Sequence, residues 1–384
     1  MHLSPSELAD RAVTTLIVIG QILIARHFIR ERNRTVLAIL SPLWLVIAID
    51  TVISFTGTAY TSPFPAPVRS GLTAVGIVWG LASFIGFSIY RLSQRAADST
   101  FALHSPERRQ VIRAVGLAAT AAPFAITGYG ALVERTNFRV CEIDLPIPGL
   151  HPDLVGKRIA QLSDLHVSPY LSVGDLARVV DMTNELKPHL TVVTGDLITQ
   201  TGDPLDLAIN ELSRLRAEAG VLGCLGNHER YARCETYVTQ ETARRGMNFL
   251  RYRARQLRWG DGVLNVAGVD YQTHRDNPEY LIGAEAMVVP GVANLLLSHN
   301  PDVFPTAVHK GYDAVLSGHT HGGQVTIEVL NQTMNFARFA TPYVSGLYRD
   351  NGRSCYVTKG IGTIAMPVRI GAPPEITLAR LVRA

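Results

Sequence analysis

The stretch RIAQLSDLH, residues 158–166, decides the fold of this chain. Its first six residues form a short, mostly apolar run that is typical of a buried strand, and the run ends at Asp164. Asp164 and His166 are two positions apart, so on an extended chain their side chains point to the same side. The stretch therefore predicts a buried strand whose carboxyl end presents two side chains able to bind a metal.

The same arrangement recurs toward the carboxyl terminus. Further apolar runs and the polar blocks after them are 190–194 with Gly195-Asp196, 221–225 with Gly226-Asn227-His228-Glu229, 293–297 with His299, and 314–316 with Gly318-His319-Thr320-His321. Helical spacing fits 173–186 and 204–215, and another strand fits 263–269. Strands that alternate with helices predict an α/β layered domain. Because functional groups gather at the carboxyl ends of strands in such sheets, we expect the five blocks to converge on one rim.

These blocks carry the residue types of a two-metal site. Taken singly, each has an ordinary structural explanation: Gly195-Asp196 fits a turn, and His299 fits a core or surface histidine. Together, imidazole and oxygen ligands in this mixture suit Mn, Fe, Zn or Co. Two ions about 3.5–4 Å apart can hold the attacking and leaving oxygens of a phosphoryl displacement, with a bridging hydroxide as the nucleophile. The pattern therefore predicts a phosphoester hydrolase with two divalent metal ions.

The order D-x-H, G-D, G-N-H-[DE], H and G-H-x-H resembles the calcineurin-like metallophosphoesterase family over about residues 157–370. The ending GHTHGGQ and the apolar amino-terminal part are similar to the bacterial, membrane-linked branch of that family. The resemblance implies a four-layer α/β/β/α sandwich around a dinuclear centre. It implies the following ligands: Asp164, His166 and His321 for the first metal, Asp196 as the bridge, and Asn227, His299 and His319 for the second.

The resemblance also implies a catalytic residue. His228 would contact the scissile phosphate, donate a proton to the leaving group and stabilise charge in the transition state. The sequence leaves open whether Asp164 instead orients His228. The other histidines, read as surface or structural residues, are His151, His189, His274 and His309. Candidates for the lining of a substrate cleft are Tyr271, His274, Arg275 and Tyr343.

The amino-terminal part contains four apolar segments, approximately 12–25, 36–55, 70–90 and 114–133. About 20 apolar residues span a bilayer as a helix. We therefore expect an all-α transmembrane region of about four helices over 1–134, a linker with an incoming strand over 135–156, and the catalytic domain over 157–384. Core helices of a soluble domain remain an alternative, whereas a cleaved signal peptide fits poorly because later segments are just as apolar.

Arginine placement predicts the orientation of these spans. The first and third connections carry Arg26, Arg30, Arg32 and Arg34, and Arg91, Arg95, Arg108, Arg109 and Arg113, whereas the second carries only Arg69. Both arginine-rich connections should be cytoplasmic, which places the catalytic domain outside the cytoplasm. The pair Arg108-Arg109 also resembles a twin-arginine export signal. Ordinary positive-inside arginines explain that pair equally well.

Composition and cysteine spacing argue against some classes of ligand. A net charge of +4 over 384 residues gives no nucleic-acid footprint. The four cysteines form no C-x-x-C pair, which argues against a thiolate zinc cluster or a redox dithiol. We expect a lipid or cell-envelope phosphoester as substrate, with a nucleotide- or lipid-linked pyrophosphate as the alternative. A non-catalytic membrane sensor is a third hypothesis, but Asp50 is the single acidic residue within the four segments and all the metal-ligand positions are retained.

Overall fold

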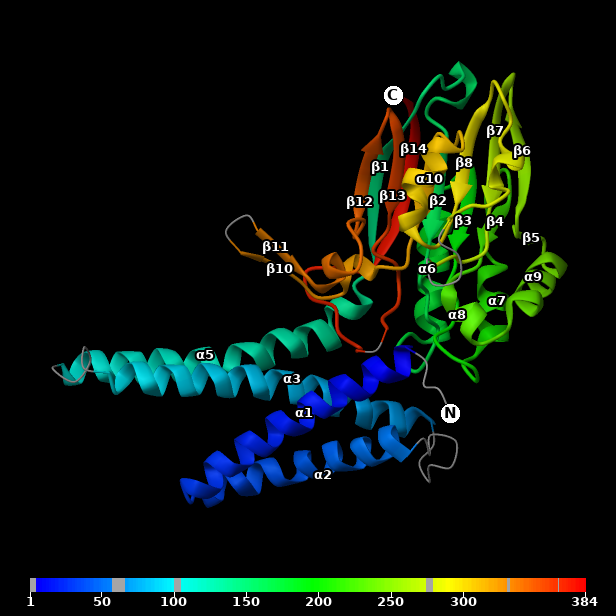
Figure 1. Ribbon diagram of the computed structural model, residues 1–384. Helices are drawn as coiled ribbons and strands as arrows, with labels where there is room; N and C mark the ends of the chain where they lie inside the picture. The colour runs from blue at the N-terminus through cyan, green and yellow to red at the C-terminus, as the bar shows by residue number, and fades with distance from the viewer. Residues whose placement is uncertain (1–4, 57–65, 100–104, 274–278, 330–331, 365) are drawn as a thin grey trace. The chain divides into compact units, whose positions relative to one another are not determined.

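The computed structural model describes residues 5–56, 66–99, 105–273, 279–329, 332–364 and 366–384 (Figure 1). The chain divides into two compact units. The helical unit comprises Met1–Val133 with the short segment Ala365–Val368, and the sheet unit comprises Glu134–Ile364 with Arg369–Ala384.

The helical unit contains α1 (Pro5–Arg30), α2 (Arg34–Thr56), α3 (Ala66–Ala97) and α5 (Pro106–Leu132). Each predicted apolar segment falls within one of these helices. Gln21 Nε2 on α1 donates to Ser83 Oγ on α3 at 2.8 Å, and Trp44 Nε1 on α2 donates to Gln21 Oε1 at 3.1 Å. A polar contact therefore joins three helices, which satisfies groups that apolar packing would leave unpaired.

Two stretches in the described part of the chain, Ala74–Ala97 and Pro106–Thr136, are long and apolar enough to cross a membrane by length and composition. α2 is 23 residues long, and the apolar stretch found among its residues with described side chains is Arg34–Ile49. The expectation of about four transmembrane helices is thus not confirmed.

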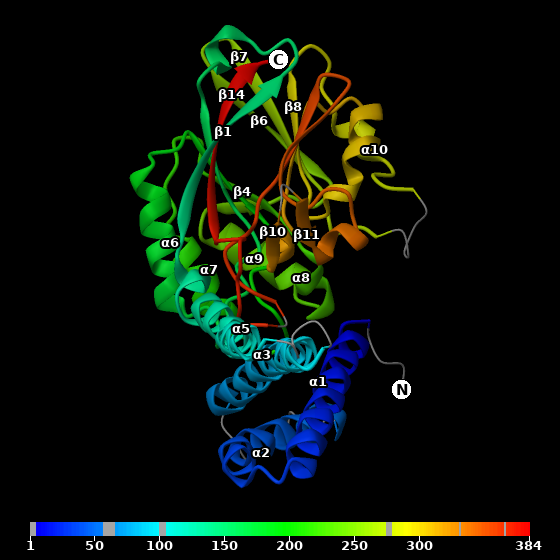
Figure 2. The same ribbon diagram turned by 90° about the vertical axis from the view of Figure 1, so that its left-hand side faces the viewer.

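Within the described residues, the sheet unit is built on two six-stranded sheets (Figures 1 and 2). The first has the order β1 (Arg139–Ile147), β14 (Glu375–Arg383), β2 (Arg158–Leu162), β3 (Leu190–Thr194), β4 (Val221–Cys224) and β5 (Met247–Phe249). The second has the order β12 (Gly346–Asp350), β13 (Arg353–Val357), β9 (Ala314–Ser317), β8 (Ala293–Leu297), β7 (Gly262–Gly268) and β6 (Arg253–Trp259). Strands β2 to β5 are parallel to one another, as are β7, β8, β9 and β13. A separate hairpin pairs β10 (Thr326–Val329) with β11 (Gln332–Asn335).

Helices cover the outer faces of both sheets. The helices are α6 (Val173–Glu185), α7 (Leu205–Leu212), α8 (Asn227–Tyr231), α9 (Glu235–Arg244) and α10 (Phe304–His309). Buried residues of α6, α7 and α9 share one apolar cluster with β2 and β3, and α10 shares another with β7, β8 and β9. The layers are therefore helix, sheet, sheet, helix, as the resemblance implied.

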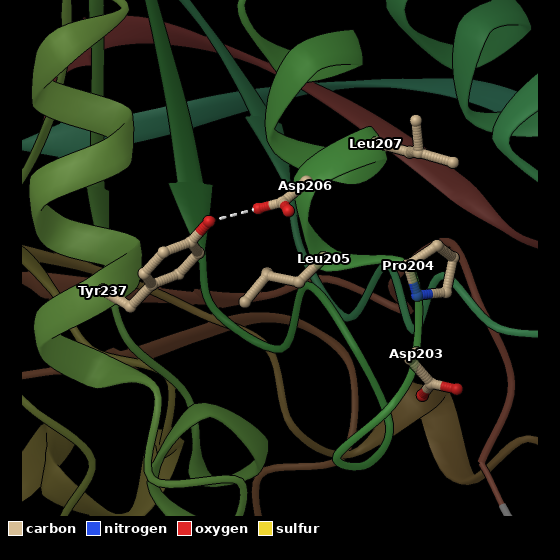
Figure 3. A pocket seen from close by; sticks show the side chains of 6 residues that line it. All are labelled: Asp203, Pro204, Leu205, Asp206, Leu207 and Tyr237. Atoms are coloured by element: carbon tan, nitrogen blue, oxygen red, sulfur yellow. Dashed lines mark hydrogen bonds between the residues drawn. The ribbon is translucent and has the colours of Figure 1, made fainter.

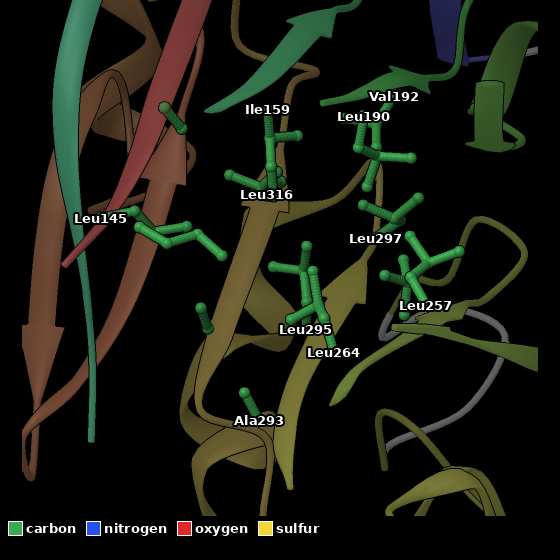
Figure 4. Packing of buried hydrophobic residues seen from close by; sticks show 14 of the residues in the cluster. Leu145, Ile159, Leu190, Val192, Leu257, Leu264, Ala293, Leu295, Leu297 and Leu316 are labelled. Carbon is green, nitrogen blue, oxygen red and sulfur yellow. The ribbon is translucent and has the colours of Figure 1, made fainter. Parts of the chain in front are cut away.

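The core between the two sheets explains why these strands are continuous apolar runs. Val192 faces the other sheet, whereas Val193 packs against helices, because side chains alternate along a strand. Leu295 and Leu297 face the first sheet (Figure 4). Leu296 between them packs in the cluster of α10. Strands buried on both faces need apolar residues at every position. The strands are therefore mostly apolar, and the charged and imidazole side chains of the predicted site appear where the strands end.

Candidate metal centre

Five strand ends bring the predicted site residues together. Asp164, Asp196 and Asn227 follow β2, β3 and β4, which are parallel neighbours and so end at the same edge. His299 and His319 follow β8 and β9 of the second sheet. The two edges are hydrogen-bonded to each other: His299 Nδ1 donates to the Thr194 carbonyl at 2.7 Å, and the His319 N–H donates to Asp164 Oδ1 at 2.9 Å.

The side chains at this rim form three overlapping groups of possible metal ligands. Within each group the ligand atoms lie within 4.8 Å of one another. The groups are Asp164, His166 and His321; His166, Asp196 and His228; and Asp196, His299 and His319. His166 Nε2 lies 3.2 Å from His321 Nε2, and His319 Nδ1 lies 3.2 Å from His299 Nε2. Pairs of imidazole nitrogens directed at each other can share a divalent cation.

The residues present fit a pair of such ions. Asn227 Oδ1 and His321 Nδ1 are buried without a hydrogen-bond partner among the described atoms. Buried polar atoms are normally paired, so an unpaired amide oxygen beside carboxylates and imidazoles fits the ligand set of a cation. The next residue, His228, donates its backbone N–H to Asp196 Oδ1 at 2.9 Å, which fixes Asn227 beside the cluster.

The backbone at the rim is held in an unusual conformation. Asp164, His166, Asp196, His319 and His321 all have φ between 48° and 77°, in the left-handed region. Non-glycine residues rarely adopt this region, and such residues concentrate at functional sites. Hydrogen bonds compensate: the His166 N–H donates to the Asp196 carbonyl at 3.0 Å. Strain at five of the eight predicted site residues supports a functional role for this rim.

Two glycines of the motifs leave room for the carboxylates. A Cβ on Gly226 would lie 2.1 Å from Asp196 Oδ1, and a Cβ on Gly318 would lie 2.3 Å from Asp164 Oδ2. Real Cβ contacts this short essentially do not occur. The glycines of G-N-H-E and G-H-T-H are therefore required by close approach.

Burial keeps most of the imidazoles neutral. It lowers the pKa of His166 and His321 well below the ordinary value, and lowers that of His319 to about 4. Neutral imidazole is the form that binds metals, so these side chains are ready to act as ligands.

His299 differs from the other histidines of the rim. Burial lowers its pKa, but the neighbouring carboxylates, chiefly Asp196, outweigh that effect and raise the pKa to about 10. Burial likewise raises the pKa of Asp196, and His299 more than reverses this, leaving it well below its usual range. In the metal-free protein His299 and Asp196 thus form a buried ion pair with an Nε2–Oδ2 distance of 3.0 Å.

Sequence comparisons give the family of this chain. Residues 157–323 match the family described as calcineurin-like phosphoesterase. The chain is 30% identical over 282 residues to YkuE of Bacillus subtilis, named an uncharacterized metallophosphoesterase, with 71% of this chain and 97% of that protein covered. The chain belongs to the calcineurin-like metallophosphoesterase family. It is therefore a hydrolase of phosphoester bonds, and the family uses a dinuclear site of divalent metals.

Two further proteins are similar in sequence to this metallophosphoesterase. It is 29% identical over 303 residues to the transmembrane protein with metallophosphoesterase domain of Danio rerio, covering 75% of this chain and 66% of that protein. It is 28% identical over 235 residues to the phosphodiesterase YaeI of Escherichia coli, covering 59% of this chain and 82% of that one. Relatives with a membrane part and relatives named for diester cleavage thus both match this metallophosphoesterase.

Two supporting residues of the metallophosphoesterase had no predicted role. Glu229, quoted only as part of its motif, accepts backbone N–H bonds from Gly226, Asp196 and Leu197 at 2.6 to 3.0 Å and so joins the ends of β3 and β4. Thr199 contacts two imidazoles: His228 Nδ1 donates to its carbonyl at 2.5 Å, and its Oγ1 lies 3.2 Å from His166 Nδ1. The hydrogen bond to His228 Nδ1 therefore comes from Thr199 and not from Asp164, and no sequence motif marks it.

Arg369 is the third unpredicted residue. Its fully buried guanidinium donates to four backbone carbonyls, those of Lys359, Gly360, Gly362 and Ala372. The Gly362 N–H in turn donates to the Asp164 carbonyl at 2.7 Å. Arg369 thus fixes the loop that holds the strained backbone of Asp164.

The remaining predicted residues divide between structural roles and the region outside the described residues. His189 Nδ1 accepts the Arg158 N–H at 3.0 Å, His151 Nδ1 accepts the Asp153 N–H at 3.3 Å, and His309 is exposed. Tyr343 is partly buried and packs on Phe304 and Tyr348. His274 and Arg275 lie outside the described residues. Tyr271 packs against His299 and His319, with ring centroids 5.9 and 5.3 Å apart.

One pocket of the sheet unit has a lining that does not suit a phosphoester. A pocket of about 480 Å³ is lined by Asp203, Pro204, Leu205, Asp206, Leu207 and Tyr237 (Figure 3). The hydroxyl of Tyr237 donates to Asp206 Oδ1 at 2.5 Å. Its described lining contains two carboxylates and no basic group, so a phosphate would be repelled there.

Substitution of Gly318 by alanine should weaken metal binding. The new Cβ overlaps Asp164 Oδ2, so the carboxylate must move, and we expect metal affinity to fall at least about tenfold. Gly174→Ala is the matched control, because a Cβ there meets only Ser172 Oγ at 3.7 Å. Metal content of the full chain after dialysis, measured by mass spectrometry, tests this. Equal metal content in both variants would contradict the steric role of Gly318.

Metal binding to the apo protein should release about one proton from His299. The folded-state pKa of about 10 lies above the ordinary 6.5, so at pH 8 His299 is protonated without metal and must lose its proton to become a ligand. Apparent affinity should therefore rise with pH until about pH 10. Calorimetric titration in buffers of different ionisation enthalpy measures the released protons. His299→Gln should release fewer, and an equal release would assign the proton elsewhere.

Proposed function

We propose that this metallophosphoesterase is a dinuclear-metal-dependent phosphodiesterase or phosphatase that acts at the outer face of a membrane. The observation that carries the proposal is the convergence of five strand ends from two sheets on one buried cluster of imidazoles and carboxylates. A structural cluster of this kind would not need strained backbone at five positions or an unpaired amide oxygen.

The ligand assignment is the one that the family resemblance implies, and the first and third groups agree with it. The proposed ligands are Asp164, His166 and His321 for the first ion, Asn227, His299 and His319 for the second, and Asp196 as the bridge. The Asp196 carboxylate lies beside a proposed ligand of each ion, with Oδ2 3.6 Å from His166 Nε2 and 3.0 Å from His299 Nε2, which supports a bridging role. When bound, the two ions would polarise the phosphoryl oxygens and lower the pKa of a water molecule. Mn, Fe, Zn and Co all suit these donors.

His228 is the proposed proton donor to the leaving group. Its Nδ1 donates to the Thr199 carbonyl, which leaves Nε2 as the nitrogen available to a substrate oxygen. It lies close to the cluster, since its ring centroid is 4.7 Å from that of His166. Proton donation from Nε2 to the departing oxygen would prevent an alkoxide from leaving unprotonated.

The membrane part of the proposal rests on the helical unit. Two stretches have the length and composition of spans, and the Danio rerio relative is named a transmembrane protein. We propose four spans in all, with the arginine-rich connections inside and the catalytic unit outside. We propose a lipid or cell-envelope phosphoester as the substrate class, because the catalytic unit would be held at the membrane surface.

Replacement of His228 by alanine tests the catalytic assignment. Hydrolysis of a dialkyl phosphodiester by the manganese-loaded full chain in detergent should fall about 100-fold or more, because an alkoxide, unlike nitrophenolate, needs a proton from a donor such as His228 in order to leave. Metal content should remain that of the wild type. His309→Ala, at an exposed position of α10, is the control and should keep full activity. Retained activity in His228→Ala would remove it from the mechanism, and lost metal would make it a ligand instead.

A reporter fused after residue 384 tests the orientation. Alkaline phosphatase, which is active only outside the cytoplasm, should be active in this fusion, and a green fluorescent protein in the same place should be dark when exported unfolded. The measurement is enzyme activity and fluorescence in intact bacterial cells. A fluorescent, phosphatase-negative pair would overturn the proposed orientation.

A further inference from the structure

A small pocket adjoins the metal centre. It has a volume of about 220 Å³ and is lined by Leu225, Gly226, Arg230, Glu235, Asp270 and Tyr271. Gly226 immediately precedes Asn227 and lies against the Asp196 carboxylate. The wall that closes the metal cluster on this side is thus also a wall of the pocket.

Tyr271 connects the pocket to the imidazoles. Its ring centroid lies 5.3 Å from that of His319 and 5.9 Å from that of His299. A group esterified to a phosphate at the cluster would therefore reach the pocket beside the Tyr271 ring.

The lining is polar. Four of the six residues, Arg230, Glu235, Asp270 and Tyr271, carry charged or hydrogen-bonding side chains. Pockets for drug-sized ligands are mostly apolar and measure about 300–1,000 Å³, so this one suits a smaller, polar group. An alkyl chain placed here would displace water from charged groups and offer them no hydrogen bonds in its place, which is unfavourable.

The charges around the pocket cancel. Arg251 binds Asp270 through two contacts, Nε to Oδ1 at 2.9 Å and Nη2 to Oδ2 at 2.8 Å. The formal charges of Arg230, Glu235, Asp270 and its partner Arg251 therefore sum to zero. A second phosphate would bring negative charge that no surplus cation compensates, so the pocket disfavours a pyrophosphate substrate.

We propose that this pocket binds the ester group of the substrate and selects a small, uncharged, hydroxyl-rich alcohol, such as glycerol. This inference rests on the proposed phosphodiesterase function. Arg230 and Glu235 offer donors and acceptors to hydroxyl groups, and Tyr271 positions the group beside the metal centre. The preferred substrate is thus a phosphodiester of a polyol.

Three p-nitrophenyl phosphodiesters test the proposal with the manganese-loaded full chain in detergent. Their second ester groups are glyceryl, butyl and 2-phosphoethyl. In each, water adds to phosphorus and the bond to the nitrophenyl oxygen breaks, which releases nitrophenol and the corresponding monoester. We expect kcat/KM for the glyceryl ester to exceed that for the other two at least about tenfold, because a site built for hydroxyl groups rejects analogues that lack them.

Variants then assign the preference to the pocket. Arg230→Met should bring the glyceryl and butyl esters to within about threefold, while Arg255→Met, an exposed arginine on β6, should keep the wild-type ratio. Glu235→Lys should raise kcat/KM for the 2-phosphoethyl ester relative to the glyceryl ester, since it gives the pocket surplus positive charge. This second variant keeps the test decisive if Arg230→Met does not fold.

The outcomes separate the two proposals. No nitrophenol from any ester would overturn the proposed function itself. Hydrolysis of all three esters at equal rates, or a preference for the butyl ester, would leave the function standing and overturn the polyol pocket. A glyceryl preference that Arg230→Met and Glu235→Lys both leave unchanged would also overturn it.

Discussion

Two buried carboxylates, those of Asp164 and Asp196, are the constraint on which the sheet unit depends. Burying a charge is unfavourable unless it is paired or binds a metal. Asp164 accepts the His319 N–H, and Asp196 accepts the His228 N–H and pairs with His299. Each partner comes from a different strand end, so five loops must meet within hydrogen-bonding distance. The left-handed backbone at these positions is the conformation that brings N–H groups and side chains to the same place.

Apolar packing between the sheets determines whether those loops can meet. The strand ends come from two sheets, and their separation depends on the core that holds the sheets face to face. A polar link at the end of that core fixes their register: Gln161 Nε2 donates to Thr194 Oγ1 at 3.0 Å within the first sheet and to the Ser317 carbonyl of the second at 2.9 Å. Because protein interiors are close-packed, a shift of either sheet would move the metal ligands directly.

The sequence predicts this centre well because its signals are local. The strands 190–194 and 293–297 have the bounds that apolar periodicity gives, and each is followed at once by its polar residue. Sequence patterns do not predict contacts between residues that are far apart in the chain. The last strand, β14, lies between β1 and β2 in the sheet. Arg369 donates to backbone carbonyls, and no motif in the sequence predicts these contacts. The four predicted spans rest on the length of apolar runs, and the two in α3 and α5 have the length and composition of a membrane span.

The metal centre explains reaction class but not selectivity. Every phosphoester presents similar oxygens to two cations, so discrimination must come from groups that touch the rest of the substrate. Here such groups include Tyr271 and Asp270, which come two or three residues after β7, and Arg230 and Glu235 on the helices that follow β4. The same strand ends thus supply both the ligands and the walls beside them. A change of substrate in this fold therefore requires only new loop residues, while the buried carboxylates and their partners remain fixed.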